Sequence, residues 1–193
     1  MNVQGPSPDQ SGDGPFFIPR SRVVAEAGMA VALAAVLKAL PAPRMVAGGS
    51  ITLGCLAPLW AFSARHGWRR GAMVGACFGA IDLMLNPAIV HWAQALLDYP
   101  LAFATAGLVG LPGLPLPAGV ALSAAARYAV HVLSGVVFFA ANAPAGTPAL
   151  AFSAVYNLYV FPDALVAGAL LAAIARRLPP LAAEMTKTRS ARE

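Results

Sequence analysis

Three polar side chains in apolar surroundings are the first candidates for chemistry in this chain. Asp98, His131 and Asn157 each lie inside a long apolar segment, where a polar group is costly and is therefore a functional candidate. His131, Gly135 and Phe139 are spaced i, i+4, i+8, so they share one face of a helix. At 1.5 Å per residue, Asp98 and Asn157 lie roughly 10–12 Å from the segment ends, and Gly135 lies at a comparable depth. The spacing predicts one layer that joins three helices.

Such a layer suits a small, flat, cationic heteroaromatic ligand. The carboxylate of Asp98 supplies a counter-charge, the Phe139 ring supplies stacking and cation–π attraction, and His131 and Asn157 supply hydrogen bonds. Gly135 is expected to leave space below Phe139. The alternative is that the polar groups only hold helices together, since interhelical polar contacts average about 0.6 kcal/mol. Spacing alone leaves both interpretations open.

The composition places these segments in a membrane. The chain has 193 residues, of which 59% are hydrophobic and 11% are charged, and its mean hydropathy is +0.68. A soluble domain carries roughly 25% charged residues, so this composition argues against a cytosolic enzyme, a secreted disulfide scaffold and a nucleic-acid binder. The net charge of +5 comes from basic residues at segment ends. We expect an integral membrane protein.

Six apolar segments predict an all-α bundle of six transmembrane helices. Two stretches rich in proline and glycine, 111–117 and 142–148, break helices because proline lacks the N–H group and clashes with the preceding turn. Residues 1–22 are expected to form a disordered cytoplasmic tail, 23–178 the membrane domain and 179–193 a cytoplasmic C-terminal tail. The predicted segments are 23–40, 51–64, 71–85, 91–111, 118–141 and 149–175.

Basic residues predict the topology. Ten of the thirteen fall into three groups: Arg20 and Arg22; Arg65, Arg69 and Arg70; and Arg176, Arg177, Lys187, Arg189 and Arg192. With six spans, all three groups lie on one side, which the positive-inside rule makes cytoplasmic. We therefore expect a multi-pass plasma-membrane protein with both termini in the cytoplasm.

The same topology predicts where the other charged residues lie. Glu26 and Arg127 are expected near the cytoplasmic interface, and Lys38 near the outer end of the first span, where its side chain can reach water. Asp82 and Asp163 lie deeper, and Asp163, which follows a proline, is expected to satisfy backbone groups that the kink frees.

Small residues predict how helices pack. Gly71, Gly75 and Gly79 recur every four residues, a pattern that lets helix backbones approach closely in lipid, and we expect them to pack within the bundle. Gly28 and Ala32 have the same spacing on the first segment, where the face can instead receive another protein.

Four ordered motifs resemble one family. They are Gly48–Leu53, Gln94–Phe103, Arg127–Phe139 and Phe152–Asn157. Each resembles the corresponding helix of the thiamine-specific substrate-binding (S) components of energy-coupling factor transporters, and the resemblance covers about residues 23–178.

The resemblance implies a six-helix membrane protein that captures thiamine from outside and has no catalytic activity. Thiamine is the transported ligand and no cofactor is implied. The implied partners are a membrane coupling subunit, which contacts Gly28 and Ala32, and two cytoplasmic ATPases. The chain itself has no G-x-x-x-x-G-K-[ST] phosphate loop, the signature of one ATPase class. The implied thiamine-binding residues are Asp98, Tyr99, His131, Gly135, Phe139, Phe152, Tyr156 and Asn157.

Some positions depart from the family pattern. Gly49 lies where some members have tryptophan, Leu53 where some have an acidic residue, and Phe139 where tryptophan also occurs. Phe152 replaces an expected tyrosine, so one hydroxyl is missing. We expect these changes to affect the relative affinities of the site for thiamine, its phosphates and its pyrimidine precursor.

The sequence leaves two alternative functions open. One is an S component for a different vitamin or for the pyrimidine precursor. The other is an intramembrane enzyme that uses Ser134 or Ser153 with His131, although no recognisable nucleophile motif accompanies these serines.

Overall fold

A computed structural model describes residues 20–41 and 49–177 of the chain. Nearly all of the two predicted tails lies outside this range. The exception is residues 20–22, which form the first turn of a helix rather than the end of a tail. The described residues contain no β-strand and form six helical segments, which confirms the all-α prediction.

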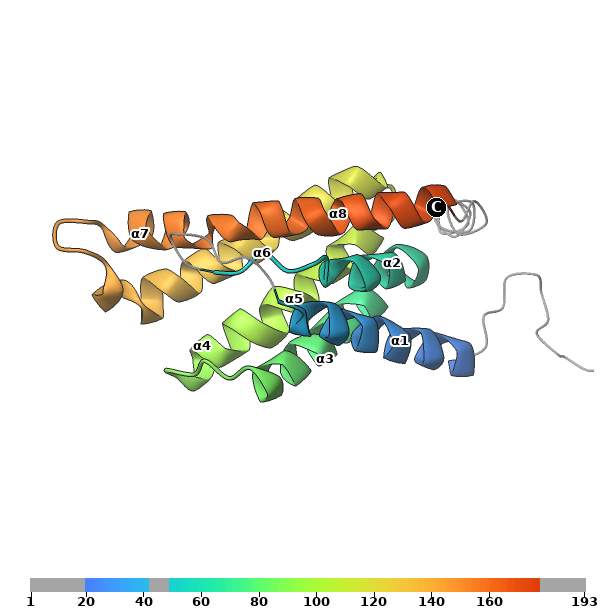
Figure 1. Cartoon of the computed structure of the whole chain (residues 1–193), viewed down its shortest axis with the longest axis horizontal. Helices are drawn as coiled ribbons and strands as arrows, with labels where there is room; N and C mark the ends of the chain where they lie inside the picture. Colours follow the sequence, from blue (N-terminus) through green and yellow to red (C-terminus); the bar gives the residue numbers. More distant parts are fainter. Residues whose placement is uncertain (1–19, 42–48, 178–193) are drawn as a thin grey trace, which may run out of the picture.

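The six segments follow the predicted order (Figure 1). Two of them, Leu116–Phe138 and Ala149–Arg176, are long and apolar enough to cross a membrane by length and composition. The segments are α1 (Arg20–Ala39), α2 (Leu56–His66), α3 (Trp68–Leu85), a fourth built from α4 (Trp92–Leu96), η1 (Leu97–Leu101), α5 (Ala102–Ala104) and η2 (Thr105–Gly110), α6 (Leu116–Phe138), and a sixth built from α7 (Ala149–Tyr156), η4 (Asn157–Tyr159) and α8 (Val160–Arg177). A short turn, η3 (Ala140–Asn142), follows α6.

The second segment is shorter than expected. The sequence predicts a helix from Ile51, whereas α2 begins at Leu56. Gly49 and Gly54 have φ angles of 76° and 88°, a left-handed conformation that glycine adopts without the cost that a Cβ atom imposes. The chain therefore enters α2 through a non-helical stretch, residues 49–55.

The fourth segment changes its helix type in the middle. Pro100 cannot donate the hydrogen bond of a regular helix and crowds the preceding turn. The chain accommodates it in η1, a π-helix in which the N–H group of Ala102 donates to the carbonyl oxygen of Leu97, five residues earlier. Such bulges often occur at functional sites. Asp98 and Tyr99 both lie in this bulge.

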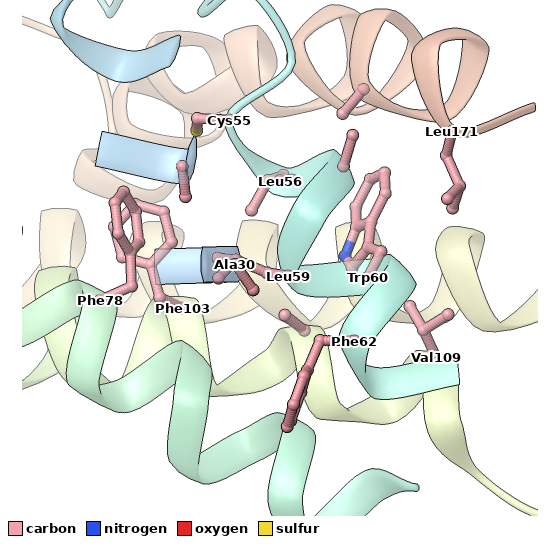
Figure 2. Packing of buried hydrophobic residues seen from close by; sticks show 14 of the residues in the cluster. Ala30, Cys55, Leu56, Leu59, Trp60, Phe62, Phe78, Phe103, Val109 and Leu171 are labelled. Atoms are coloured by element: carbon pink, nitrogen blue, oxygen red, sulfur yellow. The ribbon is translucent and has the colours of Figure 1, made fainter. Parts of the chain in front are cut away.

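The hydrophobic core lies where α2 packs against its neighbours. Trp60 and Leu59 of α2 are fully buried, and the rings of Phe78 and Phe103 meet edge to face with centroids 4.7 Å apart. Figure 2 shows these side chains around α2. Because the core fills the space between helices at this level, it fixes the elements that carry the polar residues.

The glycines of α3 pack as predicted. A Cβ atom on Gly75 would collide with the backbone of Phe103, and one on Gly79 with the backbone of Tyr99 and Pro100. The glycine face therefore lets the fourth segment approach α3 closely.

The small residues of α1 have a different environment. Gly28 and Ala32 are exposed at the bundle surface, and a Cβ atom on Gly28 would meet nothing within 4 Å. The buried residues of this helix are Ala30 and Ala34. The two small residues thus face away from the bundle.

Both described ends of the chain lie at one end of the bundle (Figure 1). Near the start of α1, Glu26 accepts hydrogen bonds from Arg22 at 2.9 Å and His66 at 2.6 Å, and Arg65 is 3.4 Å away. The predicted basic groups on the first three segments therefore gather at this end.

Candidate ligand-binding site

A cavity of about 360 Å³ opens between the helices toward the opposite end of the bundle. Its volume falls within the usual range for small-molecule sites. The structure brings all eight residues of the predicted site to its lining: Asp98, Tyr99, His131, Gly135, Phe139, Phe152, Tyr156 and Asn157.

Asp98 is held by two neighbours at the cavity wall. One carboxylate oxygen accepts a hydrogen bond of 2.7 Å from the side-chain amide of Gln94, one helical turn earlier. The other lies 3.1 Å from Nδ1 of His131 on α6. The carboxylate remains 19% exposed. Asp98 is therefore oriented from both sides while part of it stays accessible to a ligand.

His131 completes the predicted layer. Its side chain is 8% exposed, and its Nε2 atom has no hydrogen-bond partner among the described residues. The backbone carbonyl of His131 accepts a hydrogen bond of 3.3 Å from the Asn157 amide. Asp98, His131 and Asn157 thus form a connected chain across η1, α6 and the α7–η4 junction.

The amide nitrogen of Asn157 is used mainly in helix packing. It donates to the Ser153 carbonyl oxygen at 2.9 Å and lies 3.3 Å from the Ser153 hydroxyl. A Cβ atom on Gly135 would collide with that same hydroxyl. The expectation that Gly135 leaves empty space below Phe139 is therefore wrong, because Ser153 occupies the position that glycine makes available.

Aromatic rings form much of the remaining wall. The Phe152 and Tyr156 rings lie 6.2 Å apart, tilted by 40°, and Phe139 lies at the C-terminal end of α6. The Tyr99 hydroxyl donates to the Asn86 carbonyl oxygen at 2.8 Å and accepts from the Ala88 N–H group at 2.9 Å. Because both bonds go to the backbone after α3, Tyr99 offers the cavity its ring rather than its hydroxyl.

Two ion pairs at the cavity were not predicted. Lys38 was expected to reach toward water, but its ammonium lies 2.6 Å from Asp82 of α3 and lines the cavity. Arg127 was expected near the interface, but it is 4% exposed and also lines the cavity. Its guanidinium donates to Asp163 of α8 at 2.8 Å.

Asp163 also differs from the sequence expectation. It accepts hydrogen bonds from the backbone N–H group and the hydroxyl of Thr52, at 2.8 and 2.6 Å. The backbone that it satisfies therefore belongs to the non-helical stretch before α2 and not to its own helix. The hydrogen bonds from Thr52 to Asp163 therefore join this stretch to α8, and the ion pair between Asp163 and Arg127 joins it to α6.

Three further lining residues, Gln94, Phe103 and Tyr159, lie within or just after the motifs but were not among the predicted site residues. Gln94 precedes Asp98 by four residues, the spacing that places two side chains on one helix face, and this signal identifies it. Phe103 lies in the same motif. Tyr159 follows the last motif by two residues, and its ring contacts Gly49, a contact that local spacing does not reveal.

Among the described residues, the charges around the cavity leave one carboxylate without a permanently cationic partner. Lys38 is paired with Asp82, and Arg127 with Asp163. In the part of the chain that the structure describes, the Asp98 carboxylate contacts an amide and an imidazole. An imidazole that donates its Nδ1 proton to Asp98 need carry no charge. With His131 neutral, these side chains carry one net negative charge, which matches a monovalent cation.

Neither of the two candidate nucleophilic serines is paired with His131 in the described structure. The Ser153 hydroxyl donates to the Val132 carbonyl oxygen at 2.9 Å, and the buried Ser134 hydroxyl has no partner in the described structure, so neither serine is hydrogen-bonded to His131. The described residues also hold no group of three or more metal-binding side chains. The arrangement is suited to holding a ligand.

Comparison with known proteins places the chain in one family. Residues 24–183 match the family model described as thiamine transporter protein (Thia_YuaJ). The thiamine transporter ThiT of Bacillus subtilis is 30% identical over 155 residues, which cover 71% of this chain and 80% of that protein. ThiT of Lacticaseibacillus paracasei is 28% identical over 155 residues, 70% of this chain and 77% of that protein.

A solved structure supports the same fold. ThiT from Listeria monocytogenes superposes with a TM-score of 0.71 at 23% identity, and the match covers 84% of this chain and 97% of that one.

Proposed function

The chain belongs to the thiamine transporter family, and on this premise we propose that it captures thiamine from outside the cell as the substrate-binding subunit of an energy-coupling factor importer. As a member of a transporter family it is a membrane protein and not an enzyme. Thiamine is its transported ligand and not a cofactor.

One observation carries the choice of ligand. Thiamine is a monovalent cation whose thiazolium ring is joined to an aminopyrimidine. Among the described residues, the cavity contains one carboxylate, Asp98, that no permanent cation neutralises. Aromatic side chains also line the cavity. A partly buried carboxylate stabilises a ligand cation more strongly than it would in water, and ring faces add cation–π attraction.

The residue roles follow from the atoms that remain accessible. We assign Asp98 to the charged part of thiamine and Phe139 to ring stacking. Nε2 of His131 and the side-chain carbonyl oxygen of Asn157 are assigned to polar edges of the ligand, because the other polar atoms of these side chains are already used. Gly135 and the rings of Tyr99, Phe152 and Tyr156 shape the walls.

Energy for uptake comes from partners in this proposal. A membrane coupling subunit docks on the outward face that Gly28 and Ala32 form on α1, where their small side chains allow a partner helix to approach closely. Two cytoplasmic ATPases complete the complex. The chain then spans the plasma membrane several times with both termini in the cytoplasm, as its basic residues predict.

Ligand binding to the purified protein tests the function. After bound ligand is removed, titration calorimetry with thiamine, riboflavin, biotin and the thiamine pyrimidine fragment should give the tightest binding for thiamine. Mass spectrometry of the protein before this treatment should identify thiamine as the copurified ligand. Tighter binding of riboflavin or biotin would assign the chain to another vitamin, and tighter binding of the fragment to the precursor.

Partner docking needs a separate test. Gly28→Leu should leave thiamine affinity unchanged but prevent capture by the coupling subunit in a pull-down, because it fills the outward face of α1. Ala80→Leu, on an exposed position of α3, is the matched control and should preserve both. Loss of thiamine binding with retained capture in Gly28→Leu would contradict this division of roles.

A further inference from the structure

An ion pair joins α1 to α3 beside the cavity. The ammonium of Lys38 lies 2.6 Å from the carboxylate of Asp82, which comes 44 residues later in the chain. The Asp82 side chain is 3% exposed and that of Lys38 is 25% exposed. The second carboxylate oxygen of Asp82 accepts a hydrogen bond of 3.2 Å from Asn86. Both carboxylate oxygens of Asp82 therefore accept hydrogen bonds, while part of the Lys38 side chain is exposed at the cavity.

Lys38 is an unusual residue at a site for a cation. Its ammonium lies 5.0 Å from the centroid of the Phe103 ring, and both residues line the same cavity as Asp98. An uncompensated ammonium there would oppose the attraction of Asp98 for a cationic ligand and would attract an anionic one. The charge of Asp82 removes this effect, because the pair is neutral as a unit.

We propose that Asp82 preserves the selectivity of the cavity for free thiamine over its phosphate esters, because it neutralises the charge of Lys38. The proposal rests on the proposed function. Thiamine monophosphate has the same rings but carries a phosphate with about −1.5 to −2 charges at neutral pH. With Asp82 in place, a phosphate in this cavity meets Asp82 and Asp98 but no unpaired ammonium among the described lining residues.

The substitution Asp82→Asn tests the charge directly. It keeps the size of the side chain and an acceptor for Asn86 but leaves the Lys38 charge uncompensated. The net charge of the described side chains around the cavity therefore changes from −1 to zero. Thiamine affinity should fall by about tenfold, and thiamine monophosphate affinity should stay constant or rise, since a unit charge a few ångströms from a ligand charge has effects of this scale. The measured quantity is the ratio of the two dissociation constants, which does not depend on the fraction of folded protein.

The double variant Lys38→Met/Asp82→Leu separates charge from shape. It removes both charges, so the cavity keeps its net charge of −1, and the ratio should return to within about threefold of the unaltered protein. Equal weakening of both ligands in Asp82→Asn, or a changed ratio in the double variant, would show a structural role and overturn this assignment alone. Absence of thiamine binding to the unaltered protein would overturn the proposed function, and this assignment with it.

Discussion

Replacing Asp98 with asparagine is the most direct test of the site. The substitution keeps the size of the side chain and one acceptor oxygen, so the hydrogen bond from Gln94, now 2.7 Å, can persist. It removes the one charge that neither ion pair balances among the described residues near the cavity. Any loss of thiamine affinity then reports the charge of Asp98 rather than a change of shape.

The magnitude follows from the surroundings of the carboxylate. Asp98 is 19% exposed, so its charge is only partly screened by water, and it shares one oxygen with His131 at 3.1 Å. Losing a hydrogen bond to a charged group costs about 1–3 kcal/mol. This corresponds to a decrease in thiamine affinity of roughly 5- to 150-fold.

Titration calorimetry with two ligands measures this effect. The thiamine pyrimidine fragment lacks the thiazolium charge and should lose much less affinity than thiamine does. Equal losses for both ligands would mean that Asp98 contacts the aminopyrimidine and not the cation. Unchanged thiamine affinity would refute the charge-pairing role of Asp98 altogether.

Two further substitutions probe the stacking wall and the buried ion pair. Phe139→Leu should lower thiamine affinity by about 2- to 12-fold in calorimetry, since an aromatic pair contributes about 0.5–1.5 kcal/mol, and an unchanged value would argue against stacking on this residue. Asp163→Ala leaves Arg127 buried without its carboxylate, which costs about 3–5 kcal/mol and should lower the Tm of the ligand-free protein by roughly 6–20 °C. Asp163→Asn, which keeps an acceptor for Thr52, should lower it less, and an equal loss in both variants would argue against the hydrogen bonds of Thr52.

The helical segments and the Asp98 layer were predictable because local spacing encodes them. Apolar runs separated by prolines and glycines give the segment order, and the rise per residue places Asp98 and His131 at compatible depths. The structure joins these two side chains at 3.1 Å. The outward position of Gly28 on α1 was predictable for the same reason, because it depends on residue spacing within one helix.

The ion pairs were not predictable in this way. Lys38 and Asp82 are 44 residues apart and Arg127 and Asp163 are 36 apart, so their pairing depends on how the helices rotate about their axes. Depth alone placed Lys38 and Arg127 near the membrane surfaces. The direction in which a side chain points is set by packing between helices, which spacing in one helix does not contain.

The packing of α3 and the position of Asp98 are coupled. Gly79 lets the backbone of Tyr99 and Pro100 approach so closely that a Cβ atom would collide with it, and this is the π-helical turn that carries Asp98. The opposite side of the same turn is held by the contact of Asp98 with His131. The carboxylate is thus fixed between a backbone contact to α3 and a side-chain contact to α6. Preorganisation of this kind reduces the entropy lost when a ligand binds.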